Sequence, residues 1–123
     1  MYEMTVQHHF DAAHQLRGYE GKCHQTHGHR WDVEVYIKGD RLNSINMLVD
    51  FSSVKGIIDQ LDHGTPQDEI LNEVLGTPNP TAEFIAEWIY YKVQHLLDGT
   101  NQVLKEVKVT VWESPECSVM YTE

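Results

Sequence analysis

Four segments of the chain alternate between apolar and polar residues with the period of two that is typical of a strand with one buried face. The clearest is residues 30–38, where one face carries Trp31, Val33, Val35 and Ile37. Residues 4–10 alternate more weakly and are expected to pair with that strand. In residues 107–112, valine alternates with lysine, threonine and tryptophan. Residues 118–122 are expected to form a final short strand.

Two segments between the second and third strands carry apolar residues at helical spacing. The first lies between Asp50 and Leu61, after a start signal formed by Asp50 and Ser52. The second begins near residues 79–81, where proline and threonine suit a first turn and its cap, and it stops at Asp98-Gly99. Residues 64–76 are expected to form a loop with some local helix. The element order predicts a single α+β domain over residues 1–123.

Composition and charge narrow the function classes. The net charge is −10, from 19 acidic and 9 basic residues, which disfavours nucleic acid and anionic membranes as partners. No apolar run approaches the roughly 20 residues that a membrane span needs. The N-terminus lacks a secretion signal, and Cys23 and Cys117 are the only cysteines, so a reduced cytoplasmic protein is favoured over one with a disulfide.

The segment Cys23-His24-Gln25-Thr26-His27-Gly28-His29 concentrates metal-binding side chains. If the strand at 30–38 extends back through it, His27 and His29 lie on the face that carries Trp31 and can converge on one metal ion. A third histidine is needed for the usual catalytic set. His14 is the preferred candidate among His8, His9, His14 and His24, because the neighbouring alanines allow close approach of a second strand. The alternative is that these histidines are ordinary surface or singly hydrogen-bonded residues.

Cys23 has two interpretations that the residues leave open. It is either a fourth ligand that closes a structural zinc site, or a free thiolate beside a three-histidine zinc that keeps one position for substrate. Cys117 is interpreted as an ordinary buried or edge residue.

Two acidic positions are further candidates. Glu113 follows Val107, Val109 and Val111 on the same strand face, where another apolar residue is expected. It is either solvated beyond the strand end or an acceptor of two hydrogen bonds from a planar, amidine-like ligand. Asp62 and His63 close the first helix and form a possible acid–base pair, although such pairs are also common at helix ends for electrostatic reasons.

Six segments in order resemble the 6-pyruvoyltetrahydropterin synthase family. They are FDAAHQL (10–16), KCHQTHGHRWDVEV (22–35), NMLVDFSSVK (46–55), LDH (61–63), NPTAEFIAEWI (79–89) and VTVWES (109–114). The resemblance implies a tunnelling fold, in which ββααββ subunits join their antiparallel sheets into an oligomeric barrel with the helices outside and active sites between subunits. It implies a homo-oligomer, with a hexamer of two stacked trimers favoured.

The resemblance also implies roles for individual residues. Zinc is expected on His14, His27 and His29, and Cys23 is expected to be the free catalytic base. Asp62 and His63 are expected to relay protons, and Glu113 to anchor the pterin. Thr81 and Glu83 match positions that line the pterin pocket.

The three residues between Cys23 and His27 resemble the spacing in bacterial 6-carboxy-5,6,7,8-tetrahydropterin synthases of the queuosine pathway. The implied enzyme is a zinc-dependent carbon–oxygen lyase that converts 7,8-dihydroneopterin triphosphate to the 6-carboxy pterin, acetaldehyde and triphosphate. The alternatives are the pyruvoyl-forming synthase and a non-catalytic, zinc-stabilised pterin-binding protein. One departure from the family is GTPQDEI, inserted between His63 and Leu71, which bears on the substrate more than on zinc or fold.

Overall fold

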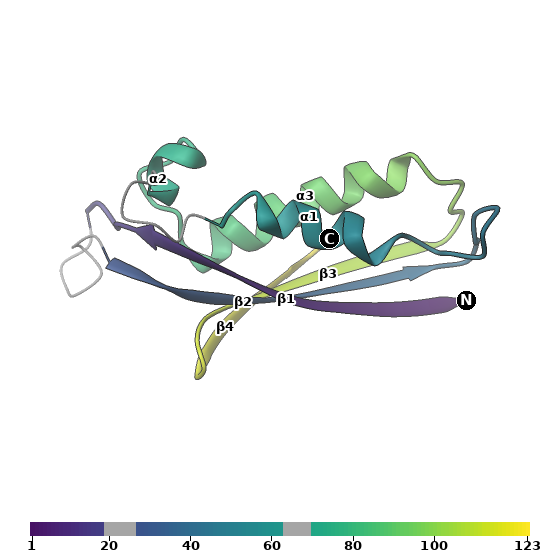
Figure 1. The fold of residues 1–123 in the computed structure, drawn as a ribbon, viewed down its shortest axis with the longest axis horizontal. Coiled ribbons are helices and arrows are strands. Elements are labelled where there is room, and N and C mark those ends of the chain that lie inside the picture. Colours follow the sequence, from purple (N-terminus) through teal and green to yellow (C-terminus); the bar gives the residue numbers. More distant parts are fainter. Residues whose placement is uncertain (19–26, 63–69) are drawn as a thin grey trace.

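The computed structural model describes residues 1–18, 27–62 and 70–123, with residue 27 described by its backbone only. It contains one antiparallel sheet with the strand order β1-β2-β3-β4 (Figure 1). The strands are β1 (Tyr2–His14), β2 (His27–Gly39), β3 (Lys105–Ser114) and β4 (Cys117–Thr122). All four predicted strands are present, and β1 and β2 are longer than the alternation alone indicated.

The pairing of β1 with β2 is continuous from Tyr2, opposite Gly39, to His14, opposite His27. One face of this pair is apolar and buried, and it includes Val6, Phe10 and Trp31. The predicted extension of the second strand back to residue 27 is therefore confirmed, and β1 runs on to bring His14 to the same end of the sheet.

The helices that the structure describes all lie on the apolar face of the sheet (Figure 1). Helix α1 (Phe51–Asp59) packs over β1, and α3 (Ala82–Asp98) packs over β3 and β4. Both predicted helix starts are confirmed, because the Asp50 carboxylate accepts a hydrogen bond from the Ser52 backbone N–H and the Thr81 hydroxyl accepts one from that of Phe84. Hydrogen bonds from the hydroxyl and backbone N–H of Ser52 lower the pKa of Asp50.

A four-residue helix, α2 (Leu71–Val74), lies within the segment expected to be a loop with local helix. The element order is therefore the predicted ββααββ with this short addition, and the α+β class is confirmed. None of the helices within the described ranges is long and apolar enough to cross a bilayer.

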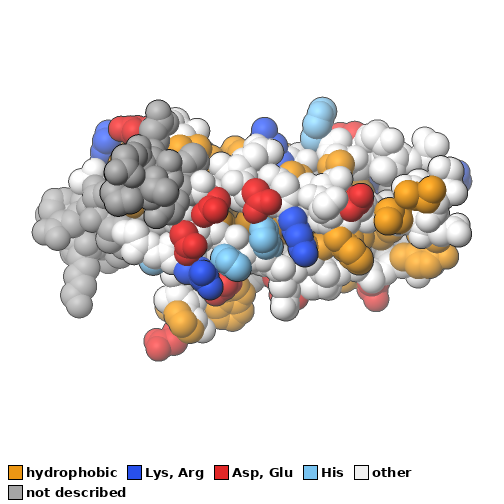
Figure 2. Space-filling view, viewed as in Figure 1, with side chains coloured by type: hydrophobic (Ala, Val, Ile, Leu, Met, Phe, Trp, Pro, Cys, Tyr) orange, Lys and Arg blue, Asp and Glu red, His pale blue; other side chains and the backbone are white. Residues whose placement is uncertain are grey.

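Apolar side chains remain exposed around the N-terminal end of β1 and the loop that leads to α1. Figure 2 shows them gathered at the end of the molecule that carries the N-terminus. They include Tyr2, Ile45, Met47 and Phe51, and a hollow of about 300 Å³ lies among them. Single exposed apolar residues are common, but a contiguous group of this kind is typical of a surface that another molecule covers.

The end of β2 is held by a close approach between Gly39 and the loop before β3. A Cβ atom on Gly39 would lie 2.6 Å from the Leu48 Cδ1 atom and 2.7 Å from the Gln102 Oε1 atom. That Gln102 oxygen accepts hydrogen bonds from the backbone N–H groups of Asp40 and Arg41, both at 2.9 Å. The Gln102 side chain therefore cannot move aside without losing two hydrogen bonds.

We expect Gly39→Ala to lower the free energy of unfolding by about 1–3 kcal/mol, because overpacking and lost hydrogen bonds act together. Gly56→Ala is the matched control. Gly56 lies inside α1 with nothing within 4 Å of an added Cβ, so alanine should stabilise the protein by about 0.5–1 kcal/mol. Urea unfolding of both variants checks the pair, and equal stability of Gly39→Ala and the wild type would contradict the packing argument.

Candidate metal centre

Two histidines from neighbouring strands meet at the end of the sheet. His14 is the last residue of β1 and is fully buried, and His29 lies near the start of β2. Their Nε2 atoms are 3.4 Å apart. Because His29 pairs across the strands with Ala12, whose side chain is small, the two rings can approach at an angle of 71°. The structure thus places next to each other two of the histidines that the sequence proposes as metal ligands.

The other ring nitrogen of each histidine faces a backbone carbonyl. The Nδ1 atom of His14 lies 3.0 Å from the Pro80 oxygen, and that of His29 lies 3.2 Å from the Arg30 oxygen. A carbonyl only accepts hydrogen bonds, so in the neutral imidazole Nδ1 carries the hydrogen. In this tautomer the lone pair lies on Nε2, which is the usual arrangement of metal-binding histidines.

Glu113 brings a carboxylate to the same point. Its Oε1 atom lies 3.2 Å from the His14 Nε2 atom and 3.8 Å from that of His29, and the side chain is 35 % exposed. The pairing of β3 with β4 is irregular between Trp112 and Ser114, at the position of Glu113. The residue is therefore in contact with the histidines and is not simply solvated beyond the strand end.

The three side chains fit a zinc ion in chemistry and spacing. Imidazole nitrogen and carboxylate oxygen are zinc ligands, and bonds of about 2.0–2.1 Å place the ligands of a tetrahedral ion roughly 3.3 Å apart. The observed separations of 3.2, 3.4 and 3.8 Å bracket that value. His14, His29 and Glu113 thus form a group that could hold a metal ion. Residue 27 lies directly opposite His14 in the strand register, and its side chain is outside the described part of the chain.

A buried amide fixes the backbone around His14. Asn72 of α2 is 5 % exposed. Its Oδ1 atom accepts a hydrogen bond from the Gln15 N–H at 2.9 Å, and its Nδ2 atom donates to the carbonyls of Gln15 and Pro78 at 2.7 and 2.8 Å. These bonds join the residue after His14 to the segment whose Pro80 carbonyl faces the His14 ring. Sequence reasoning did not identify Asn72, since a lone asparagine after a loop carries no pattern.

Of the remaining predicted site residues, the structure describes Asp62, Thr81 and Glu83. Asp62 is exposed, and its Oδ1 atom accepts a hydrogen bond from the Asp11 N–H at 3.0 Å. Thr81 caps α3 next to Pro80, and Glu83 is exposed in the first turn of that helix. Cys23 and His63 lie outside the described residues, so their predicted roles are not addressed by the structure.

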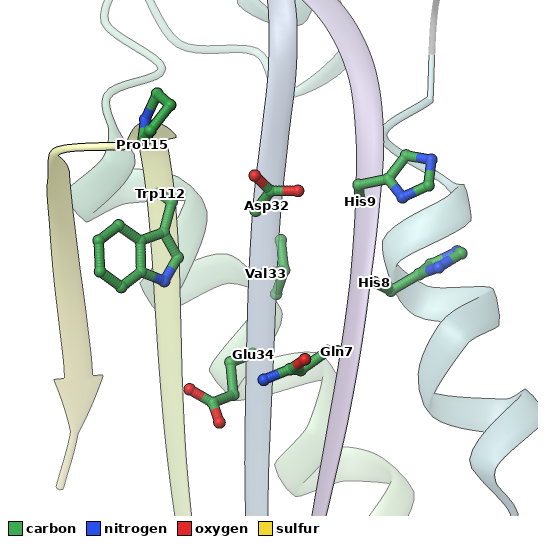
Figure 3. Close-up of a pocket in the computed structure, with 8 residues that line it drawn as sticks. All are labelled: Gln7, His8, His9, Asp32, Val33, Glu34, Trp112 and Pro115. Atoms are coloured by element: carbon green, nitrogen blue, oxygen red, sulfur yellow. The ribbon is translucent and has the colours of Figure 1, made fainter.

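The opposite face of the sheet carries a separate hollow of about 470 Å³ (Figure 3). Its lining includes Gln7, Asp32, Glu34 and Trp112, which alternate with the buried apolar residues of β1, β2 and β3. None of the side chains of His14, His29 and Glu113 lines this hollow. His14 and His29 alternate in step with the buried residues Phe10 and Trp31, so they lie on the helix-covered face.

Comparison with known proteins identifies the family. Residues 3–123 match the family described as 6-pyruvoyl tetrahydropterin synthase. The chain belongs to that family, and the predicted resemblance is confirmed.

The individual relatives carry the names of two different enzymes. The chain is 30 % identical to the 6-carboxy-5,6,7,8-tetrahydropterin synthase of Haemophilus influenzae over the full length of both chains. It is 42 % identical to the enzyme of that name from Synechocystis, over 69 % of each chain. It is also 32 % identical to a dihydroneopterin monophosphate aldolase of Pyrococcus furiosus, over 89 % of this chain and 88 % of the relative.

A solved structure shows the same fold at lower sequence identity. The 6-pyruvoyl tetrahydropterin synthase of Plasmodium falciparum superposes with a TM-score of 0.67 at 18 % identity, covering 99 % of this chain and 97 % of that one. This similarity supports the architecture and carries no argument about substrate.

We expect Asn72→Ala to lower the free energy of unfolding by about 2–4 kcal/mol, because three backbone groups lose their buried partner. It should also weaken metal binding at His14, since the residue after His14 and the segment that carries Pro80 lose the side chain that joins them. Asn101→Ala, in the exposed loop between α3 and β3, is the control and should change stability by less than about 0.5 kcal/mol. Thermal unfolding measures the stability and a zinc competition titration measures the metal affinity. Wild-type stability and affinity in Asn72→Ala would contradict the supporting role of Asn72.

Proposed function

We propose that this member of the 6-pyruvoyl tetrahydropterin synthase family is a zinc-dependent 6-carboxy-5,6,7,8-tetrahydropterin synthase. It would convert 7,8-dihydroneopterin triphosphate and water to the 6-carboxy pterin, acetaldehyde and triphosphate, as a carbon–oxygen lyase of queuosine biosynthesis. The observation that carries the proposal is the convergence of the His14 and His29 Nε2 atoms, with Glu113 beside them, in a chain whose relatives include synthases of that name.

His14, His27 and His29 are the residues proposed to hold zinc. The described geometry of His14 and His29, and the position of residue 27 opposite His14, support this set. When bound, zinc would supply Lewis acidity that polarises oxygens of the substrate side chain and acidifies the neighbouring C–H bond. Two histidines with a carboxylate are also a set of ligands found in catalytic zinc sites. Glu113 lies close enough to both histidines to serve as such a ligand in the absence of substrate.

The protein residues would bind the pterin and move protons. Cys23 is proposed to take the proton from the substrate carbon, because a thiol near zinc and imidazoles has a lowered pKa. His63, oriented by Asp62, would return a proton elsewhere on the substrate. The hydrogen bond from Asp11 ties one Asp62 oxygen to β1 and would leave the other to orient His63. Glu113 is proposed to accept hydrogen bonds from the amidine-like edge of the pterin, with Thr81 and Glu83 lining the pocket.

The enzyme is further proposed to act as a cytoplasmic homo-oligomer, a hexamer of two stacked trimers, with active sites between subunits. Two features support assembly. The outer edges of β1 and β4 have no neighbouring strand within the described sheet, and unpaired edges are sites where another chain can add. The exposed apolar group around Tyr2, Met47 and Phe51 is a second surface suited to burial against another copy.

A second candidate activity comes from the aldolase of Pyrococcus furiosus. Its name indicates cleavage of a dihydroneopterin monophosphate by a member of the same family. The two activities differ in the phosphate that the substrate carries and in the carbon fragment that is released. The insertion between His63 and Leu71 directly follows the predicted relay pair in the sequence, and it is the feature that would adapt the site to such a different substrate. The pyruvoyl-forming synthase and a non-catalytic pterin-binding protein are the remaining alternatives.

The proposal predicts that the zinc-loaded protein forms 6-carboxytetrahydropterin and acetaldehyde from 7,8-dihydroneopterin triphosphate. Mass spectrometry of the products, with dihydroneopterin monophosphate as a parallel substrate, distinguishes the candidates. A pyruvoyl product without acetaldehyde indicates the related synthase, and cleavage of the monophosphate alone indicates the aldolase.

Cys23→Ala separates a catalytic thiol from a zinc ligand in the same assay. A catalytic thiol predicts retained zinc and a loss of turnover of at least about 100-fold. A ligand predicts loss of zinc together with loss of stability. If the wild-type protein binds zinc and leaves both substrates unchanged, the proposed activity is wrong although the fold and family stand.

A further inference from the structure

Trp31 lies between the hydrophobic core and the metal centre. It is fully buried on β2, two residues after His29. Its ring stacks in parallel with the Phe10 ring, with 5.8 Å between the centroids. It also contacts the two imidazoles. The His14 ring lies edge-on at a centroid distance of 4.8 Å and an angle of 79°, and the His29 ring is tilted by 34° at 4.3 Å. A single indole thus contacts two candidate ligands that come from different strands.

The polar atom of Trp31 is not accounted for by the packing. Its indole N–H is buried and has no hydrogen-bond partner among the residues that the structure describes. A buried donor without a partner loses its hydration without compensation. Phenylalanine would fill much of the same core position, next to Phe10, without that cost. Stability of the core alone therefore does not explain tryptophan at this position.

The width of the indole offers an explanation. Each imidazole already has its Nδ1 atom directed to a carbonyl, Pro80 for His14 and Arg30 for His29. A hydrogen bond at Nδ1 constrains the position of that atom more strongly than the tilt of the ring plane. The shared contact with Trp31 restricts both ring planes at once, and so fixes the direction of both Nε2 lone pairs toward the same point.

We propose that Trp31 is a positioning residue of the metal centre, acting through the faces and edges of its ring and not through its N–H group. This inference rests on the metal centre of the proposed function and is independent of which pterin is the substrate. It assigns to the aromatic core a role in metal affinity, in addition to its role in folding.

The first experiment measures zinc affinity by competition with a chromogenic chelator. We expect Trp31→Phe to bind zinc about 10- to 100-fold more weakly, the range typical of residues that orient metal ligands. Replacing Trp31 by 3-benzothienylalanine keeps the bicyclic shape and removes the N–H, and should leave the affinity within about twofold of the wild type. Trp88→Phe is the matched control, because Trp88 lies on α3 against Lys92 and should not affect zinc.

The second experiment reads Trp31 directly and does not depend on stability of a Trp31 variant. The chain has three tryptophans, so Trp88→Phe combined with Trp112→Phe leaves Trp31 as the single indole. We expect Co²⁺, which absorbs and quenches, to lower its fluorescence with the midpoint of metal binding, and His14→Ala to abolish that response.

Three results would overturn the inference: wild-type zinc affinity in Trp31→Phe, a loss in the benzothienyl variant equal to that of Trp31→Phe, or Trp31 emission that ignores bound Co²⁺. The proposed function fails separately. A protein that binds zinc with the expected dependence on Trp31 and turns over no dihydropterin would retain the inference and lose the activity.

Discussion

The register between β1 and β2 is the constraint on which the site depends. Side chains of a strand alternate between faces, so a slip of one residue would carry the apolar set of β1 out of the core and His14 with it. Burial of Val6 and Phe10 against the helices therefore fixes the position of His14 at the end of the strand. The same pairing places Ala12 opposite His29, which leaves space for the two rings to approach. The energy that orders the sheet also positions the two imidazoles.

Further contacts from the segment before α3, from the core and from β3 complete this arrangement. The carbonyl of Pro80, immediately before the cap of α3, sets the His14 ring, and Asn72 joins that segment to the end of β1. Trp31 meets both imidazoles from the core side. Glu113 approaches from β3. His14 is fully buried, whereas the His29 and Glu113 side chains are 22 % and 35 % exposed and are the members of the group that are open to solvent and to a ligand.

The sequence predicted the fold well because the strands and helices each carry a strong local pattern. Alternation identified β2 and β3, and the caps at Asp50 and Thr81 placed α1 and α3. The site was predictable only in part. His29 follows from continuing the second strand backwards, the neighbouring alanines favour His14, and alternation places Glu113 on the face of Val107 and Val111, but the contact of Glu113 with both imidazoles is a tertiary feature that no local pattern gives. Asn72 and the Pro80 carbonyl could not be identified, because their roles arise from tertiary contacts that join distant segments.

We propose an open metal centre made of imidazoles at the end of the β1–β2 pair, in which the Cys23 thiol is not a ligand. Zinc K-edge X-ray absorption of the zinc-loaded protein tests it directly. The account predicts nitrogen and oxygen neighbours at about 2.0–2.1 Å, with the outer-shell scattering of several imidazoles and no sulfur neighbour. A sulfur shell at about 2.3 Å would contradict it, because Cys23 would then close the site and the zinc would have a structural role.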